Sequence, residues 1–550
     1  MRDEAGSIGT SLARLLEAPH LARVVPHLAP ETLHRLIRYA GLEACGDIVA
    51  SATPAQLESV FDLDLWRHAR PGENERFDAD RFGEWLGLFA EAGGSAAARA
   101  IAAMDEKLLI AGLSLHVRVF DPAAIALPTS VEGEAFDIDV TTPGTECEVG
   151  GYLVRAIRTD AWDPVVTLLL ALDAEHHDRF HTVMQGCRRL SNSTPERDGL
   201  DDVLLEPEQL FYDMALERDR RRSRQGYTTT AGARAFLQLA RQPRRHSKGE
   251  TSVNPVVAAY FRDADEVFTE AADPQQASAS HPDRTDANAG PESPDAVLLT
   301  LAEAGIVPQR PHALLEGTQP QSARLQYIRT LMDYVRDADD AVYVARNREL
   351  AFLANTLVAG CSIQSRSLTP QEASDVAVGA CNLGLEHWSA RWPEPLEASL
   401  SGRGINLPDA FLIDHDLVDA FEVGWAVLYD EVCMFVAGRL IAALSDLRCG
   451  DPYIQGGLNV LRTQLTTHRD AGTPWRARQA LEVVALLDMP AWNSLLALID
   501  ECPVLPASMT ATLEGRTRSV SATDFECIST RSQLVTVRDF MSRLPDILRG

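Results

Sequence analysis

The stretch Thr-Pro-Ala-Gln-Leu-Glu-Ser-Val-Phe at residues 53–61 shows most directly how this chain folds. Thr53 suits an N-cap, Pro54 suits the first helical position, and Gln56 completes a variant of the capping box. The apolar residues that follow have the spacing of one helical face: Leu57, Val60 and Phe61. The sequence therefore predicts a helix that begins at Pro54 and buries one side.

The same spacing recurs on both sides of this stretch, across residues 8–118. The apolar faces there are formed by Leu12, Leu15, Leu16, Leu33, Leu36, Ile37, Phe82, Trp85, Leu86, Phe89, Leu108 and Leu109. Short helices with short connections indicate a helical array. No fixed repeat length is visible, so the sequence does not assign the array to a named repeat family.

Residues 134–157 have a different pattern. Apolar and acidic residues alternate from Phe136 to Val140, which is the period of a strand. Thr142-Pro143-Gly144 predicts a turn, and a second strand is expected from Cys147 to Val154, with a bulge at Gly150-Gly151. This region is therefore predicted to be a small β-hairpin inserted among helices.

Residues 295–550 return to helical spacing, with the most apolar helix between Val423 and Leu444. Two short strands are expected at 510–513 and 525–528, followed by a helix that a second capping box opens at Thr530. The whole chain is predicted to be mainly α, a multi-helix array with a small β-hairpin insertion and a short C-terminal β element.

Composition divides the chain into four segments. We expect an N-terminal helical array at 1–125, a β-hairpin plus helical domain at 126–269, and a C-terminal helical domain at 295–550. Residues 270–294 lack large hydrophobic side chains and are rich in Ala, Asp, Pro and Ser. Such a segment cannot bury enough apolar surface to order itself, so it is predicted to be a disordered linker.

The charge of the chain narrows the classes of partner. There are 51 Lys+Arg against 79 Asp+Glu, a formal net charge of −28. Such a surface repels phosphate, which argues against general nucleic-acid binding. No clean tract of about 20 apolar residues is present, so no membrane span is expected. The nine cysteines are scattered without a C-x-x-C pair and no signal peptide is evident, which favours a reducing cytoplasm.

The densest histidine cluster is Glu-His-His-Asp-Arg-Phe-His at 175–181, so it includes the stretch His176–His181. On a helix, His177 and His181 share one face at i, i+4, a spacing that a divalent transition metal can bridge. The His177-Asp178 pair also resembles the central dipeptide of helical metal-dependent phosphohydrolases. The cluster therefore supports a metal-dependent hydrolase as the alternative function. The simpler interpretation is a solvated polar helix face.

The chain has one strongly basic cluster: Arg218, Arg220, Arg221, Arg222 and Arg224. Guanidinium groups suit phosphate, nucleotide or acidic protein partners, so the cluster is a candidate anion- or partner-binding site. Basic residues also stabilise the last turn of a helix, and Gly226 stands where a terminating glycine belongs. A third interpretation is pairing with the acidic residues of this same chain.

No motif of high specificity for catalysis is present. The sequence contains no G-x-x-x-x-G-K-[ST], no G-x-S-x-G and no G-x-G-x-x-G after a strand. No cofactor is identified, although a divalent metal fits the histidines. The sequence thus favours a cytosolic protein-interaction or regulatory scaffold with a protein partner over an enzyme.

Three segments carry a family resemblance. The segment 349–355 with Gly360, and Cys-Asn-Leu-Gly-Leu-Glu at 381–386, resemble parts of a bacterial family of unknown function. Phe-x-Cys-Ile-Ser-Thr at 525–530 is similar to the C-terminal segment of that family. The resemblance implies a mostly helical cytosolic protein without a known activity. Separately, the helices at 53–109 resemble the cytosolic helical domain of MgtE-type magnesium transporters, whose membrane domain has no counterpart in this sequence.

Overall fold

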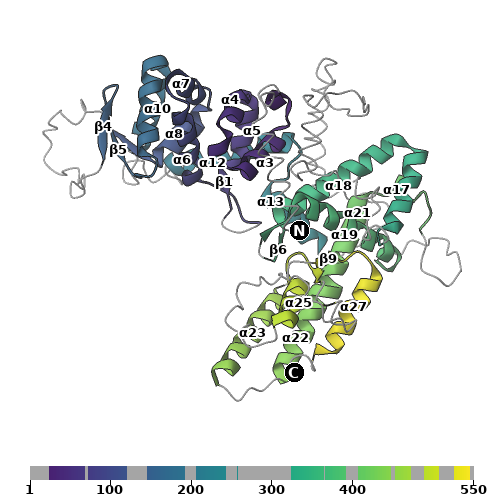
Figure 1. Ribbon diagram of the computed structural model, residues 1–550. Coiled ribbons are helices and arrows are strands. Elements are labelled where there is room, and N and C mark those ends of the chain that lie inside the picture. Colours follow the sequence, from purple (N-terminus) through teal and green to yellow (C-terminus); the bar gives the residue numbers. More distant parts are fainter. Residues whose placement is uncertain are drawn as a thin grey trace, which may run out of the picture. The chain divides into compact units, whose positions relative to one another are not determined.

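The computed structural model in Figure 1 describes residues 24–68, 72–120, 145–191, 206–242, 257, 324–364, 366–391, 407–446, 452–471, 489–506, 509 and 525–544. The chain divides into two compact units. The N-terminal unit comprises Met1–Arg67, Glu75–Arg221 and Ala279–Val307, and the C-terminal unit comprises His68–Asn74, Arg222–Ser278 and Pro308–Gly550. The predicted linker at 270–294 lies outside the described residues. The predicted class, mainly α with small β elements, is confirmed.

Short helices dominate the N-terminal unit. They are η1 (Val25–His27), α3 (Pro30–Ala40), η2 (Glu43–Cys45), α4 (Gly46–Ser51), α5 (Pro54–Asp64), α6 (Ala79–Glu91), α7 (Gly94–Ala102), α8 (Glu106–Ser114), α10 (Trp162–Glu175), α11 (His177–Ser191) and α12 (Glu206–Arg224). The last residues of α12 belong to the C-terminal unit, because the chain passes from one unit to the other after Arg221.

The capping box predicted at Thr53 is confirmed at the start of α5. The Thr53 side chain accepts from the Gln56 N–H, and the Gln56 side chain accepts from the Thr53 N–H. The buried Gln56 amide also donates to the carbonyls of Val25 and Leu28, at 2.8 and 2.7 Å. One side chain therefore caps α5 and holds the η1 segment against it.

The strands of the N-terminal unit form two small antiparallel sheets. β1 (Trp66–Arg67) pairs with β2 (Arg76–Phe77), while β5 (Tyr152–Ala156) lies between β3 (Val117–Phe120) and β4 (Glu146–Val149). The sequence did not predict β3, because its four residues directly follow a helix and show only one full alternation.

The predicted bulge at Gly150-Gly151 is wrong. Val149 pairs directly with Tyr152, so the two glycines form a two-residue hairpin turn between β4 and β5. Both have positive φ, 53° and 80°, which such a turn favours and which only glycine adopts without strain. The strand and the turn predicted before residue 145 lie outside the described residues.

The C-terminal unit is also built mainly from helices. They are α13 (Thr230–Ala240), α17 (Gln326–Ala338), α18 (Asp340–Gly360), α19 (Pro370–Arg391), α20 (Phe411–Asp414), α21 (Leu417–Val427), α22 (Phe435–Asp446), α23 (Pro452–Asp470), α25 (Met489–Ile499) and α27 (Arg531–Ser542). The apolar helix predicted between Val423 and Leu444 is confirmed as buried. A π-helical turn, η5 (Leu428–Met434), joins α21 to α22 within it.

Helices α19 and α21 cross at a point where both carry glycine. A Cβ on Gly384 would lie 2.8 Å from the carbonyl carbon of Ala420, and one on Gly424 would lie 2.8 Å from that of Ala380. Only hydrogen fits at either place, so the two backbones touch directly. The crossing lies in the hydrophobic core of the C-terminal unit, to which α17, α18, α19 and α21 contribute.

Two more strand pairs belong to the C-terminal unit. β6 (Ser362–Ile363) pairs with β7 (Arg366–Ser367), and β8 (Val504–Pro506) pairs with β9 (Phe525–Cys527). The strand predicted at 525–528 is confirmed, but the structure pairs it with β8; the predicted strand at 510–513 lies outside the described residues. The capping box at Thr530 is confirmed at the start of α27. None of the helices in the described ranges is long and apolar enough to cross a membrane.

Candidate functional site

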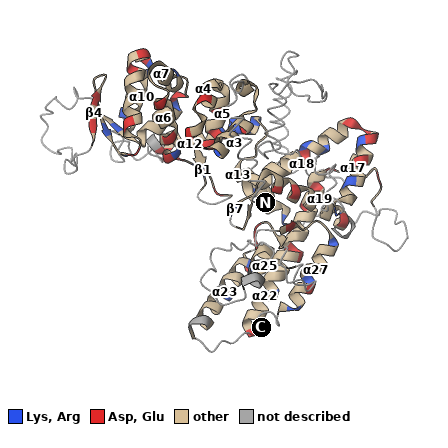
Figure 2. Ribbon diagram, viewed as in Figure 1, with Lys and Arg blue, Asp and Glu red and all other residues tan. Residues whose placement is uncertain are grey.

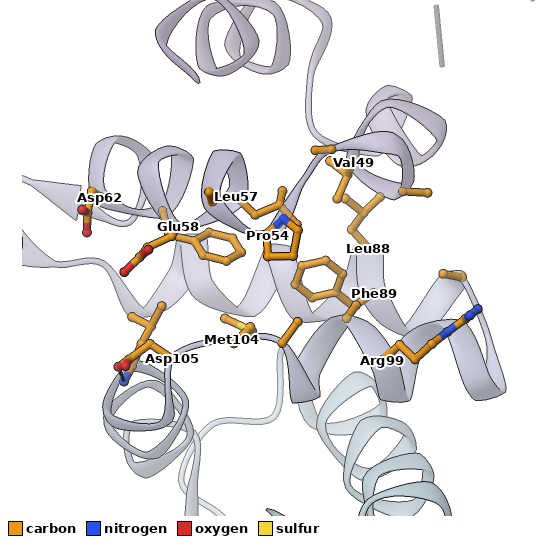
Figure 3. Close-up of a pocket in the computed structure, with 18 of the residues that line it drawn as sticks. Val49, Pro54, Leu57, Glu58, Asp62, Leu88, Phe89, Arg99, Met104 and Asp105 are labelled. Atoms are coloured by element: carbon orange, nitrogen blue, oxygen red, sulfur yellow. Dashed lines mark hydrogen bonds between the residues drawn. The ribbon is translucent and has the colours of Figure 1, made fainter. Parts of the chain in front are cut away.

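A groove of about 1150 Å³ opens in the N-terminal unit. Its walls come from α4, α5, α6, α7 and α8, with three further residues from α12. Figure 3 shows Leu88 and Phe89 of α6 beside Pro54 and Leu57 of α5, with Met104 opposite. These side chains give the groove an apolar lining.

The charged residues that line the groove are mainly acidic. The acids are Glu43, Asp47, Glu58, Asp62, Glu91, Asp105 and Glu217, against the basic residues Arg99 and Arg221. In Figure 3, Glu58, Asp62 and Asp105 gather at one end, and Arg99 lies at the other. The groove therefore combines an apolar lining with a negative rim.

Some of these acids already have partners. Arg221 donates two hydrogen bonds to Asp62, at 2.8 and 2.7 Å, and lies 3.5 Å from Glu58. Lys107 pairs with Glu217 at 2.6 Å, and Asp105 caps α8. Within the described part of the chain, the structure gives no ion pair to the remaining three: Glu43, Asp47 and Glu91. Their charge is available to a ligand.

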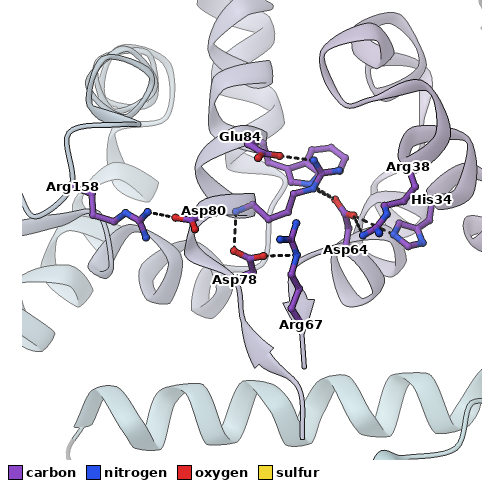
Figure 4. A network of polar contacts seen from close by, with 10 residues as sticks. His34, Arg38, Asp64, Arg67, Asp78, Asp80, Glu84 and Arg158 are labelled. Atoms are coloured by element: carbon purple, nitrogen blue, oxygen red, sulfur yellow. Dashed lines mark hydrogen bonds and ion pairs between the residues drawn. The ribbon is translucent and has the colours of Figure 1, made fainter. Parts of the chain in front are cut away.

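A buried ionic network fixes the walls on which the groove depends (Figure 4). The Asp64 side chain, at the end of α5, is fully buried. It accepts from Arg81 Nε at 2.6 Å and from Trp85 Nε1 at 2.8 Å, both on α6, and contacts His34 of α3 at 3.2 Å. Burial by itself would raise the pKa of Asp64, but these hydrogen bonds outweigh it and hold the pKa well below its usual value. Asp64 therefore links α3, α5 and α6 through hydrogen bonds.

The predicted histidine pair lies at the start of α11. The Nε2 atoms of His177 and His181 are 3.0 Å apart, as the i, i+4 spacing predicts. Each ring is held through its other nitrogen: His177 Nδ1 lies 2.8 Å from Asp173 Oδ1, and His181 Nδ1 lies 3.2 Å from Tyr152 Oη. The described residues contain no group of three or more His, Cys, Asp or Glu that could hold a metal ion. The metal-dependent hydrolase stays a prediction.

The arginine cluster is divided among different surroundings. Arg218 is only 3% exposed; its Nε donates to the Asp62 carbonyl at 2.6 Å, and its guanidinium lies 4.9 Å from the centre of the Trp66 ring. It also pairs with Glu75 at 2.6 Å. Together with Arg221, it therefore pairs with acids of its own unit.

The rest of the cluster lies at the end of α12. Arg222 lies over the ring of Tyr227, while Arg220 and Arg224 are exposed. Gly226 has a φ of 87° and follows the helix as expected of a terminating glycine. Figure 2 shows blue positions interspersed with red ones on the helices of each unit. Anion or partner binding by the cluster stays a prediction.

Comparison with known protein families gives a match to part of this unit. Residues 6–196 match DUF6178, a family of unknown function. The DUF6178 match runs from before α3 to beyond α11, so it includes most of the groove and the histidine pair. Searches of curated proteins and of solved structures gave no match.

The match confirms the expected resemblance to a family of unknown function. The segments that suggested it, at 349–360, 381–386 and 525–530, lie outside the part that matches DUF6178. The likeness of residues 53–109 to magnesium transporters receives no support from the comparisons. DUF6178 assigns no activity, so the function has to be argued from the geometry.

Sequence reasoning missed the groove and the partners of the histidines. Acids such as Asp47 and Glu91 lie at the ends of separate short helices, and no linear spacing brings them together. Asp173 lies four residues before His177, but α10 ends at Glu175 and α11 begins at His177, so the i, i+4 rule for a single helix does not give this contact. Tyr152 could not be found either, because the β4–β5 hairpin carries it there.

Proposed function

We propose that the N-terminal unit binds a short amphipathic helix of a partner protein. The apolar face of that helix would enter the groove, and its Lys and Arg side chains would face the acidic rim. This proposal specifies the partner of the protein-interaction scaffold that the sequence favours. The observation that carries it is the combination of an apolar lining with seven acidic and two basic residues in one groove.

The lining of the groove supports a helix as the ligand. Amphipathic helices bind by placing anchors at i, i+3, i+4 and i+7 in an apolar groove between helices. The lining offers separate contacts for such anchors, from Val49 and Leu57 to Phe89 and Met104. Its volume of about 1150 Å³ leaves room for several apolar side chains of such a helix.

The charge of the rim supports a basic ligand. Asp47 and Glu91 have no ion-pair partner among the described residues, and the Glu58 side chain is half exposed. A basic segment would gain from these charges and would be attracted over a distance of about 10 Å at moderate salt. An acidic peptide would be repelled.

A titration with two designed peptides tests the proposal. One peptide is an amphipathic helix of about 18 residues, or five turns, made of Leu and Lys. The other has Glu in place of Lys. With the full-length protein, fluorescence anisotropy should detect binding of the Leu/Lys peptide, weakening as salt is added, and no binding of the Leu/Glu peptide.

Variants locate the binding. Reversing both rim charges, with Asp47→Lys and Glu91→Lys, should weaken the Leu/Lys peptide by about fivefold to thirtyfold, because each exposed pair contributes up to about 1 kcal/mol. Glu148→Lys with Glu208→Lys is the matched control, since it makes the same change of charge at exposed sites that do not line the groove.

A steric variant separates the groove from general attraction. Ala103 is exposed and lines the groove, so Ala103→Trp should fill it and reduce binding without unfolding the unit. The proposal is refuted if the Leu/Lys peptide does not bind, or if both charge-reversal proteins lose the same affinity. Affinity unchanged by Ala103→Trp would also refute it, because the apolar lining would then play no part.

A further inference from the structure

The histidine pair of α11 has a feature that its sequence spacing does not show. Both rings approach each other through Nε2, and both are anchored through Nδ1. An ionised carboxylate only accepts hydrogen bonds, so in the state with both rings neutral His177 Nδ1 donates to Asp173 and His177 Nε2 carries a lone pair. His181 Nε2 must then donate to His177, and His181 Nδ1 accepts from the Tyr152 hydroxyl.

We propose that His177 and His181 together chelate a divalent late transition metal, Cu²⁺ or Ni²⁺, through their Nε2 atoms. This site is independent of the groove. Binding needs one change of tautomer: the His181 proton moves from Nε2 to Nδ1, where it donates to Tyr152 Oη. Both Nε2 lone pairs then face the metal, and no proton is lost from the protein.

The distance between the two nitrogens is compatible with the coordination angle of these metals. Nitrogens bound at about 2.05 Å and separated by 3.0 Å subtend an angle of roughly 95° at the metal. That angle is close to the 90° of square-planar and octahedral geometry, which Cu²⁺ and Ni²⁺ favour. A tetrahedral zinc site would need the nitrogens roughly 3.3 Å apart. Both rings can tilt about χ2, a soft torsion, to aim at a common point.

The surroundings support a cation at this place. Asp173 orients His177 in the manner of the carboxylate–histidine pairs of metal sites, which raises the basicity of the ligand. The N-terminal end of α11 opposes a cation by up to about 1 kcal/mol, but the Asp173 carboxylate, 2.8 Å from His177 Nδ1, offsets this. His177 is 63% exposed, so the metal can reach the pair and complete its coordination with water.

The β4–β5 hairpin positions the tyrosine. Gly150 lies directly against Phe180 and Asp173, and any Cβ there would collide with the Phe180 ring. Its positive φ turns the chain so that Tyr152, the next residue but one, packs against Phe180 and meets His181. The histidine pair and its two anchoring side chains therefore come from three elements: α10, α11 and β5.

Titration of the full-length protein with Cu²⁺ and Ni²⁺ tests the proposal. Isothermal calorimetry should give one equivalent that the double variant His177→Ala, His181→Ala lacks. Electron paramagnetic resonance of the Cu²⁺ protein should show coupling to two imidazole nitrogens, and the double variant should lose this signal. Affinities should follow Cu²⁺ > Ni²⁺ > Zn²⁺.

A matched control keeps the number of histidines. In His181→Ala with Thr182→His, the second histidine moves to i+5, off the face of His177, at an exposed position. This protein should lose at least tenfold in affinity for Cu²⁺. Asp173→Asn should weaken binding by about tenfold to a hundredfold while the two-nitrogen signal remains, because Asp173 orients a ligand without being one.

Two results would overturn the proposal. One is an equivalent of metal that survives unchanged in the double variant, which would place the metal at other histidines. The other is equal affinity in the wild-type protein and the Thr182→His control, which would show that the geometry of the pair does not matter.

Discussion

The same substitution, glycine to alanine, should have opposite effects at two helical positions of the C-terminal unit. At Gly384 in α19, a methyl group would lie 2.8 Å from the Ala420 carbonyl carbon and 2.9 Å from the Gly424 nitrogen. At Gly438 in α22, it would meet nothing within 4 Å. Local helix propensity favours alanine by about 1 kcal/mol in both places.

The size of the effect at Gly384 follows from what must move. Ordinary contact begins near 3.4 Å, and the Ala420 carbonyl oxygen lies closer to the added methyl group than the carbon does. The helices α19 and α21 therefore have to separate by more than the roughly 0.6 Å that the carbon alone requires, because backbone cannot move aside as a side chain can. A gap of that size forfeits about a quarter of the dispersion energy across the interface. Overpacking costs about 3 kcal/mol or more, and after the gain in propensity the net loss is about 2 kcal/mol or more.

Hydrogen exchange measures this effect locally, which suits a chain of two units that need not unfold together. In Gly384→Ala, peptides from α21 should exchange at least tenfold faster, while peptides from α3 in the N-terminal unit keep their protection. In Gly438→Ala, the protection of α22 should stay the same or rise. If Gly384→Ala leaves α21 as protected as in the wild-type protein, the close approach of the helices does not exist.

Three further predictions concern buried charges. Asp64→Asn should destabilise the N-terminal unit by about 3 kcal/mol, because Arg81 loses its buried carboxylate partner and keeps only the more exposed Glu84. In the wild-type protein the pKa of Asp64 is depressed, so this stability is present above about pH 4 and is lost as pH falls further, as acid denaturation followed by circular dichroism would show. Burial raises the pKa of Glu349 to about 7, although the nearby Arg346 acts to lower it. The folded protein therefore keeps this proton at a pH where the unfolded chain has lost it, so the stability of the C-terminal unit should fall as pH rises from about 4 to 7. Glu349→Gln still accepts from the Leu417 N–H and should flatten this dependence in thermal melts; an unchanged profile would exclude Glu349 as its source. In urea unfolding, Arg218→Met should lower the free energy of unfolding several times more than the same change at the exposed Arg220, whose effect should stay within about 0.5 kcal/mol. Equal effects would show that the buried contacts of Arg218 do not stabilise the unit.

Local features of the fold could be predicted from the sequence. Two helix starts are predicted by capping boxes, one at Thr53 with Gln56 and one at Thr530 with Gln533. A capping box needs only two residues that are three positions apart. The apolar spacing that follows each box predicts which face is buried. These signals lie within a turn or two of helix, so tertiary packing does not change them.

Features that depend on distant residues could not be predicted. The Gly150-Gly151 pair was assigned to a bulge, because the register that pairs Val149 with Tyr152 is visible only in three dimensions. In the sequence, Gly384 and Gly424 look like ordinary glycines within two helices. The need for glycine at both positions becomes clear only from the crossing of α19 and α21. The histidine pair was found from its i, i+4 spacing.

The arginine cluster links the sequence to the proposed partner. Three interpretations were open, and the structure shows internal pairing for Arg218 and Arg221. Arg221 reaches from α12 to Asp62 and Glu58, which line one end of the groove. One end of the groove is therefore already occupied by a guanidinium group of the same chain, that of Arg221.

This internal contact indicates how a partner would be oriented. Asp62 is occupied by Arg221, so a basic side chain of the ligand gains little at that end of the groove. Asp47 and Glu91 belong to α4 and α6 and have no internal arginine among the described residues. The partner helix should therefore place its densest Lys and Arg residues against these two acids. For this reason, reversing the charge of Asp47 and Glu91 should weaken binding more than removing Asp62, whose charge the protein itself neutralises.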